Sequence, residues 1–135
     1  MQNNLKLVYV DMDGVLIDAC KWHQVSLNEA LKQICNYEIS LEEHFKEFNG
    51  IPTKVKLKKL ADRKIILNDE ILFEKIENLK QEITIQYIEN FASERKEKIE
   101  LMNLLRQKNI KIACYTNSIK RTAELMLKKI GVLQY

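Results

Sequence analysis

The chain has 135 residues, the length of one ordinary domain, and its composition of 46% hydrophobic and 30% charged residues is typical of a soluble globular protein. Its net charge of +3 is too small to indicate a nucleic-acid or membrane partner. No apolar run is long enough to cross a bilayer, and the first residues have no signal-peptide pattern. We therefore expect a cytoplasmic protein that binds neither nucleic acid nor membrane.

The first predicted strand covers residues 5–10 and runs directly into Asp11, Asp13 and Gly14. Ligands of open α/β sheets bind at the carboxyl ends of strands. Side chains two apart on an extended backbone point to the same side, so both acids could face one ligand. Two like charges this close repel, which favours one ionised carboxylate, as nucleophile or metal ligand, and one that carries a proton. The alternative is a strand followed by an Asp-Gly turn with solvated acids.

The middle of the chain has a helical pattern. Leu27, Ala30, Leu31 and Ile34 recur three and four residues apart, as on one face of an amphipathic helix. Further helices are expected at about 40–48, at 53–63, from Asn68–Asp69 toward Tyr87, and at 93–108, with a break at Gly50–Ile51–Pro52. The last of them would be the crossover that returns the chain to the sheet.

Several polar and sulfur-containing residues are explained most simply by a position on the surface or in the core. His44 and a basic cluster are expected on solvated surfaces; the cluster comprises Lys54, Lys56, Lys58, Lys59, Arg63 and Lys64. The three cysteines, Cys20, Cys35 and Cys114, have no metal-ligand spacing and are expected to be reduced. Cys114, inside an apolar strand, is expected to be a small core residue.

A second strand is predicted at 110–115, and it ends at Thr116–Asn117–Ser118 before a helix that Gly131 terminates. Hydroxyls and free backbone N–H groups at the positive end of a helix suit an anion such as phosphate. Taken alone, these three residues are explained more simply as helix caps. Together with the two acids after the first strand, they favour a phosphate-handling site.

The two motifs resemble those of a known family. Asp11-Met12-Asp13-Gly14-Val15 resembles the first motif of the haloacid dehalogenase superfamily of phosphotransferases, and Thr116-Asn117 resembles the second. The residues between them are similar to the cap of phosphoglycolate phosphatase and β-phosphoglucomutase relatives. The resemblance implies an α/β fold with a Rossmann-like core, residues 1–17 and 91–135, and an inserted α-helical cap, residues 18–90. With two strands predicted, the parallel sheet would be incomplete.

The resemblance also implies an activity, a Mg²⁺-dependent phosphatase that hydrolyses a small phosphorylated metabolite. Asp11 would be the nucleophile that forms an aspartyl-phosphate, and Asp13 the general acid and base. Mg²⁺ would bind Asp11 and the main-chain carbonyl of Asp13. Thr116 and Asn117 would hold the phosphoryl oxygens.

Two cap residues are candidates for contact with the substrate. His23 lies where relatives similar to β-phosphoglucomutase carry a histidine at the core–cap junction; the alternative is a hydrogen-bonded junction histidine. Lys54 follows the break at 50–52, which in relatives with this cap forms a loop that contacts the substrate; the alternative is a surface lysine. The cap sequence does not indicate which metabolite binds, and the sequence does not indicate an oligomeric state.

The chain departs from the family pattern at its end. A lysine motif and an acidic-pair motif normally follow the second motif, but the sequence ends at Tyr135. We therefore expect a fragment of a longer protein. Three alternatives stay open: a sugar-phosphate mutase of the same fold, a Schiff-base phosphonate hydrolase that needs a cap lysine with a depressed pKa, and a truncated protein that only binds a phosphometabolite or a partner.

Overall fold

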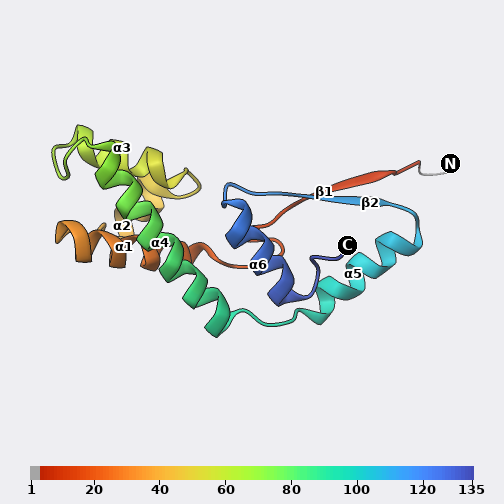
Figure 1. Ribbon diagram of the computed structural model, residues 1–135. Helices are drawn as coiled ribbons and strands as arrows, with labels where there is room; N and C mark the ends of the chain where they lie inside the picture. Colours follow the sequence, from red (N-terminus) through yellow and green to blue (C-terminus); the bar gives the residue numbers. More distant parts are fainter. Residues whose placement is uncertain (1–3) are drawn as a thin grey trace. The chain divides into compact units, whose positions relative to one another are not determined.

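The computed structural model describes residues 4–135 (Figure 1). The chain folds into two compact units, one made of Met1–Ala19 and Ile88–Tyr135 and the other of Cys20–Tyr87. The first unit contains both strands, which form a parallel sheet, and the regular elements of the second are all helices. The predicted α/β class with a helical insertion is confirmed.

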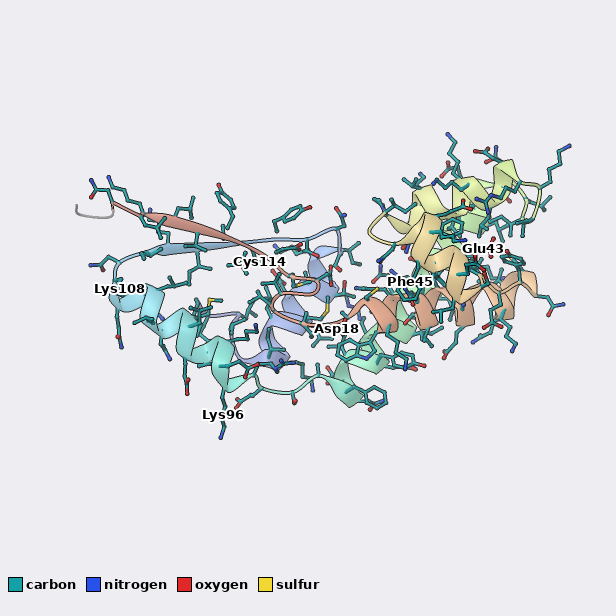
Figure 2. All side chains as sticks on the ribbon, turned by 180° about the vertical axis from the view of Figure 1, so that it is seen from behind. Asp18, Glu43, Phe45, Lys96, Lys108 and Cys114 are labelled. Atoms are coloured by element: carbon teal, nitrogen blue, oxygen red, sulfur yellow. The ribbon has the colours of Figure 1, made fainter. Side chains whose placement is uncertain are left out.

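In the α/β unit, β1 (Leu7–Asp11) pairs in parallel with β2 (Lys111–Tyr115), and Asp11 lies opposite Tyr115. The helices α5 (Lys96–Gln107) and α6 (Lys120–Ile130) lie on the same side of the two strands in both views (Figures 1 and 2). On β1 the side chains alternate between half-buried and exposed, as expected for a sheet covered on one face. Tyr9 is 74% exposed and Tyr115 61% exposed.

One face of α6 belongs to the core of the α/β unit. Ala123, Met126 and Ile130 recur three and four residues apart and are buried, together with Met102 of α5. The helix ends at Gly131, whose φ of +88° is a left-handed conformation that glycine adopts without strain. Gly131 thus performs the predicted helix-terminating role.

The helical unit consists of α1 (Cys20–Cys35), α2 (Leu41–Glu43), the π-helical turn η1 (His44–Phe48), α3 (Thr53–Asp62) and most of α4 (Glu70–Phe91). Its core contains Leu27 and Leu31 of α1, Phe48, Leu57 of α3 and Ile76 of α4. The predicted break at 50–52 falls between η1 and α3. None of the helices in residues 4–135 is long and apolar enough to cross a membrane.

Three expectations about burial are wrong. Cys114 is exposed, because it lies near the end of a strand that has only β1 beside it in the described chain (Figure 2). His44 is only 2% exposed, because η1 turns it toward the interior of the helical unit. Lys56 is only 8% exposed, because it lies four residues before Leu60 on the inner face of α3.

Candidate active site

The ends of β1 and β2 bring the two sequence motifs together. The backbone N–H of Met12 donates to the Tyr115 carbonyl at 3.2 Å, which extends the pairing one residue beyond Asp11. The Thr116 hydroxyl Oγ1 then donates to Asp13 Oδ2 at 3.3 Å. Two of the predicted site residues, far apart in the sequence, are therefore in direct contact.

A tight turn rather than the strand orients Asp13. β1 ends at Asp11, whereas the sequence suggested an extended run through both acids. The Met12 carbonyl accepts hydrogen bonds from the N–H groups of Leu16 at 3.0 Å and Ile17 at 3.1 Å. Gly14 adopts φ +81° in this turn, a conformation that a side chain would strain. Buried Met12, Leu16 and Ile17 anchor the turn in the α/β unit.

The two carboxylates have different surroundings. The Asp11 side chain is exposed, while Asp13 is half-buried and is bonded to Thr116. The pKa of the nearby Cys114 thiol is raised, mainly by partial burial. The negative charges of Asp11 and Asp13 raise it further. The acids therefore share one edge of the sheet, and the Cys114 thiol stays protonated at neutral pH.

The segment between β2 and α6 is not a simple helix cap. The Thr116 hydroxyl accepts a hydrogen bond from the Ser118 N–H at 3.0 Å while it donates to Asp13. The N-cap position of α6 is Ile119, which makes no side-chain capping hydrogen bond. The capping alternative therefore does not describe Thr116, which instead links the segment to the first motif. Asn117, next to it, has an exposed side chain.

His23 and Lys54 both belong to the helical unit. Burial, and then the charges of Lys80 and Lys56, lower the pKa of His23 to about 3, so its imidazole is neutral at neutral pH. The Lys54 ammonium lies 2.8 Å from the Glu70 carboxylate on the surface, and this hydrogen bond raises the pKa of Lys54. The predicted contacts of these residues with a substrate stay predictions.

The acidic pair fits a loosely held divalent cation. In residues 4–135 no cluster of three or more histidine, cysteine or acidic side chains is arranged to hold a metal. Mg²⁺ commonly binds through one or two carboxylates together with water and substrate phosphates. Asp11 and Asp13 match that ligand set, while a closed zinc-type cage would need more ligands.

A family model for haloacid dehalogenase-like hydrolases matches residues 8–135, which is nearly the whole chain. The chain belongs to this family. The family assignment made from the two motifs is confirmed, and the Asp13–Thr116 hydrogen bond joins those same motifs in space.

Solved structures agree with this fold. A hydrolase from Pseudomonas syringae superposes with a TM-score of 0.73 and 18% identity over 94% of this chain and 56% of its own length. A β-phosphoglucomutase from Clostridium difficile gives a TM-score of 0.74 with 18% identity, 94% coverage of this chain and 56% of its own length. The chain therefore has the Rossmann-like core, and it spans little more than half the length of each of these two proteins. No curated protein sequence matches it.

Two buried polar residues were not recognised from the sequence. Lys56 was grouped with a solvated basic cluster, although its four-residue spacing to Leu60 places it on the apolar face of α3. His44 follows two glutamates and looks like a surface residue, and no periodic signal marks the π-helical turn that buries it. The helical spacing could have identified Lys56 but not His44.

Proposed function

We propose that the protein carrying this chain is a Mg²⁺-dependent phosphatase that hydrolyses a small phosphorylated metabolite through an aspartyl-phosphate. The observation that supports this most directly is the hydrogen bond from Thr116 to Asp13, with the exposed Asp11 carboxylate on the same edge of the sheet. In this proposal residues 1–17 and 91–135 are the catalytic core, and residues 18–90 are a cap that selects the substrate.

Asp11 is the proposed nucleophile. Its carboxylate is exposed and can approach a phosphate monoester in line with the leaving oxygen. A bond forms between an Asp11 oxygen and phosphorus while the bond from phosphorus to the leaving oxygen breaks. The leaving oxygen takes a proton from Asp13. Water then attacks the aspartyl-phosphate, returns a proton to Asp13 and releases inorganic phosphate with the free Asp11 carboxylate.

Thr116 and Asn117 are the proposed phosphate-binding residues. The Thr116 hydroxyl is held in place by the Ser118 N–H, which leaves it oriented toward the site of Asp13. Its single proton is donated to Asp13 in the substrate-free chain and would be donated to a phosphoryl oxygen when the phosphate is bound. Mg²⁺, held by the Asp11 carboxylate and the Asp13 main-chain carbonyl, would offset the negative charge of the phosphate and the acids.

Release of inorganic phosphate from a panel of phosphate esters in the presence of Mg²⁺ tests the proposal. Asp11→Asn is expected to remove the activity, because an amide is not a competent nucleophile. Asp18→Asn is the matched control, since Asp18 is an exposed acid just beyond the same motif (Figure 2). Undiminished activity of Asp11→Asn would contradict the assignment.

A sugar-phosphate mutase is the closest alternative, since a β-phosphoglucomutase shares the fold. It would yield an isomer of the substrate instead of free phosphate, so product analysis separates the two.

A non-catalytic binding protein would bind phosphate esters without turnover. A Schiff-base hydrolase requires a lysine with a depressed pKa. The pKa of Lys54 is raised, whereas burial lowers the pKa of Lys56. Borohydride trapping with a carbonyl substrate therefore tests Lys56.

A further inference from the structure

The outer edge of β1 has no neighbouring strand in residues 4–135, where the sheet consists of β1 and β2. The Lys111 N–H donates to the Lys6 carbonyl at 2.9 Å, so the backbone of Lys6 faces β2. Successive residues of a strand direct their backbone groups to opposite sides. The N–H and C=O groups of Leu7, Tyr9 and Asp11 therefore face the outer edge, where another strand could bind them.

This edge lacks the features that usually protect an edge strand from pairing. Residues 5–10 contain no proline, and β1 pairs with β2 without an inserted residue. Lys6 is the one charged residue of this segment. The side chains of Leu5, Leu7 and Tyr9 are 56%, 39% and 74% exposed. The edge is therefore an apolar template for a further strand.

The charges along β1 favour a second copy of the same strand in the antiparallel direction. Lys6 immediately precedes β1, Asp11 ends it and Asp13 follows. A parallel copy would bring like charges together at both ends, which is unfavourable. An antiparallel copy instead brings Lys6 of each chain beside the acidic end of the other. A twofold axis produces this arrangement, because it pairs the same edge of both copies.

A twofold axis at Val8 matches the backbone groups of the two edges. It places Tyr9 of each copy opposite Leu7 of the other, and both residues direct their backbone groups to the outer edge. Each such pair can exchange two hydrogen bonds. The Tyr9 and Leu7 side chains then form an apolar cross-strand pair on the exposed face of the sheet. A shift by one residue would place Tyr9 opposite Val8, whose backbone groups face β2, so these bonds would be lost.

We propose that two copies of this chain associate through the outer edges of β1, antiparallel and with Val8 at the twofold axis, to form one continuous four-stranded sheet. Two short strand edges bury less area than the roughly 1,600 Å² of a standard interface, so the association depends on chain concentration. It requires neither Mg²⁺ nor turnover of a phosphate ester. This proposal and the proposed phosphatase activity can therefore fail independently.

Analytical ultracentrifugation of the full chain over a wide range of concentrations tests the association. We expect the average mass to rise from 16.0 kDa toward twice that value as the concentration increases. Tyr9→Pro should stay monomeric, because it removes an N–H that faces the outer edge and leaves the bonds to β2 in place. Tyr115→Thr is the matched control and should retain the dimer. Tyr115 is 61% exposed on the same face of the sheet as Tyr9, but it belongs to β2.

A new cysteine tests the register, in a chain whose three native cysteines are replaced by serine. Opposite residues of a pair without hydrogen bonds have Cα atoms about 4.5 Å apart, which a disulfide can span. On oxidation Val8→Cys should therefore link two chains, whereas Val10→Cys, away from the axis, should not.

Three results would overturn the proposal. The first is a wild-type chain that stays at 16.0 kDa at every concentration, which would leave the edge to a different polypeptide. The second is a dimer that persists in folded Tyr9→Pro, and the third is a dimer that Tyr115→Thr abolishes, since this would indicate stacking of the exposed faces. If Tyr9→Pro does not fold, the wild-type mass and the Val8→Cys disulfide still decide.

Discussion

Asp11 and Asp13 lie only two residues apart, but the chain gives them different environments. Asp11 ends a strand and is exposed; Asp13 sits in a turn, is half-buried and accepts a hydrogen bond from Thr116. This difference suits a division of labour between a nucleophile and a proton carrier. Thr116 connects the two motifs through its hydroxyl, so we expect a change of this side chain to affect both.

Thr116→Val tests that connection. It removes the hydroxyl that bonds Asp13 and accepts from Ser118, at nearly unchanged volume. A hydrogen bond to a charged group is worth about 1.5–3 kcal/mol, so we expect phosphate-ester turnover (kcat/KM) to fall by roughly 10- to 100-fold. Thr116→Ser keeps the hydroxyl and should stay near wild type. Equal activity in the two variants would argue against a role for the hydroxyl.

The buried histidines predict loss of stability in acid. The pKa of His23 falls from 6.5 to about 3 on folding, and that of His44 is also lowered. The unfolded chain therefore binds more protons than the folded chain below pH 6.5, so the free energy of unfolding decreases as the pH falls from 6.5 toward about 3. Each histidine contributes at most about 1.4 kcal/mol per pH unit.

Urea unfolding at a series of pH values measures this slope. In the double variant His23→Gln/His44→Gln the decrease between neutral and mildly acidic pH should be smaller, because neither glutamine titrates. An unchanged slope would mean that other groups, such as the carboxylates, control acid unfolding.

At the level of helices and turns, individual residues tie the elements together. The Asn28 side chain on α1 accepts from the Ile39 N–H at 3.0 Å and donates to the Ile39 carbonyl at 2.9 Å. It thereby holds the segment before α2 against α1. In the other unit, Gly131 ends α6 in a left-handed conformation next to Ile99 of α5.

Asn28→Ala should destabilise the chain by about 1–3 kcal/mol, since it leaves both backbone groups of the buried Ile39 without their partner. Asn78→Ala, at an exposed position of α4, is the control and should change stability little. Chemical denaturation of the two variants compares them. Equal stability would show that water replaces the Asn28 amide without cost.

Gly131→Ala should cost about 1–2 kcal/mol, because φ is +88° and an added Cβ would lie 2.7 Å from Ile99 Cδ1. Gly50→Ala is the matched variant, with φ +75° and open space around its Cβ position. It should show the backbone cost alone. The difference between the two free energies of unfolding measures how easily the end of the Ile99 side chain moves away.

The elements themselves could be predicted because their patterns are local. Apolar spacing identified the helices, and apolar runs that end in polar residues identified both strands and the site at their ends. Burial could not be predicted where it depends on what packs over a residue. Cys114 lies in an apolar strand but is exposed, while His44 follows two glutamates but is buried. The turn that orients Asp13 was also missed, because it depends on three hydrogen bonds to the Met12 carbonyl.

For the whole molecule, the division into two units places all the proposed catalytic and phosphate-binding residues in one of them. The α/β unit contains Asp11, Asp13, Thr116 and Asn117 at one edge of a two-stranded sheet. The helical unit contains the pocket beside His44, whose lining includes both Lys21 and Glu38. The family match over residues 8–135 establishes which fold carries these sites. The proposed mechanism requires that Asp11 becomes covalently phosphorylated.

Trapping the intermediate tests that claim most directly. The protein is mixed with phosphate esters and Mg²⁺, quenched in acid and reduced with borohydride, which converts an aspartyl-phosphate to homoserine, and the peptide containing residue 11 is analysed by mass spectrometry. We expect homoserine at position 11, with Asp13 and Asp18 unmodified. Homoserine at another acid, or turnover without any modified residue, would contradict the account.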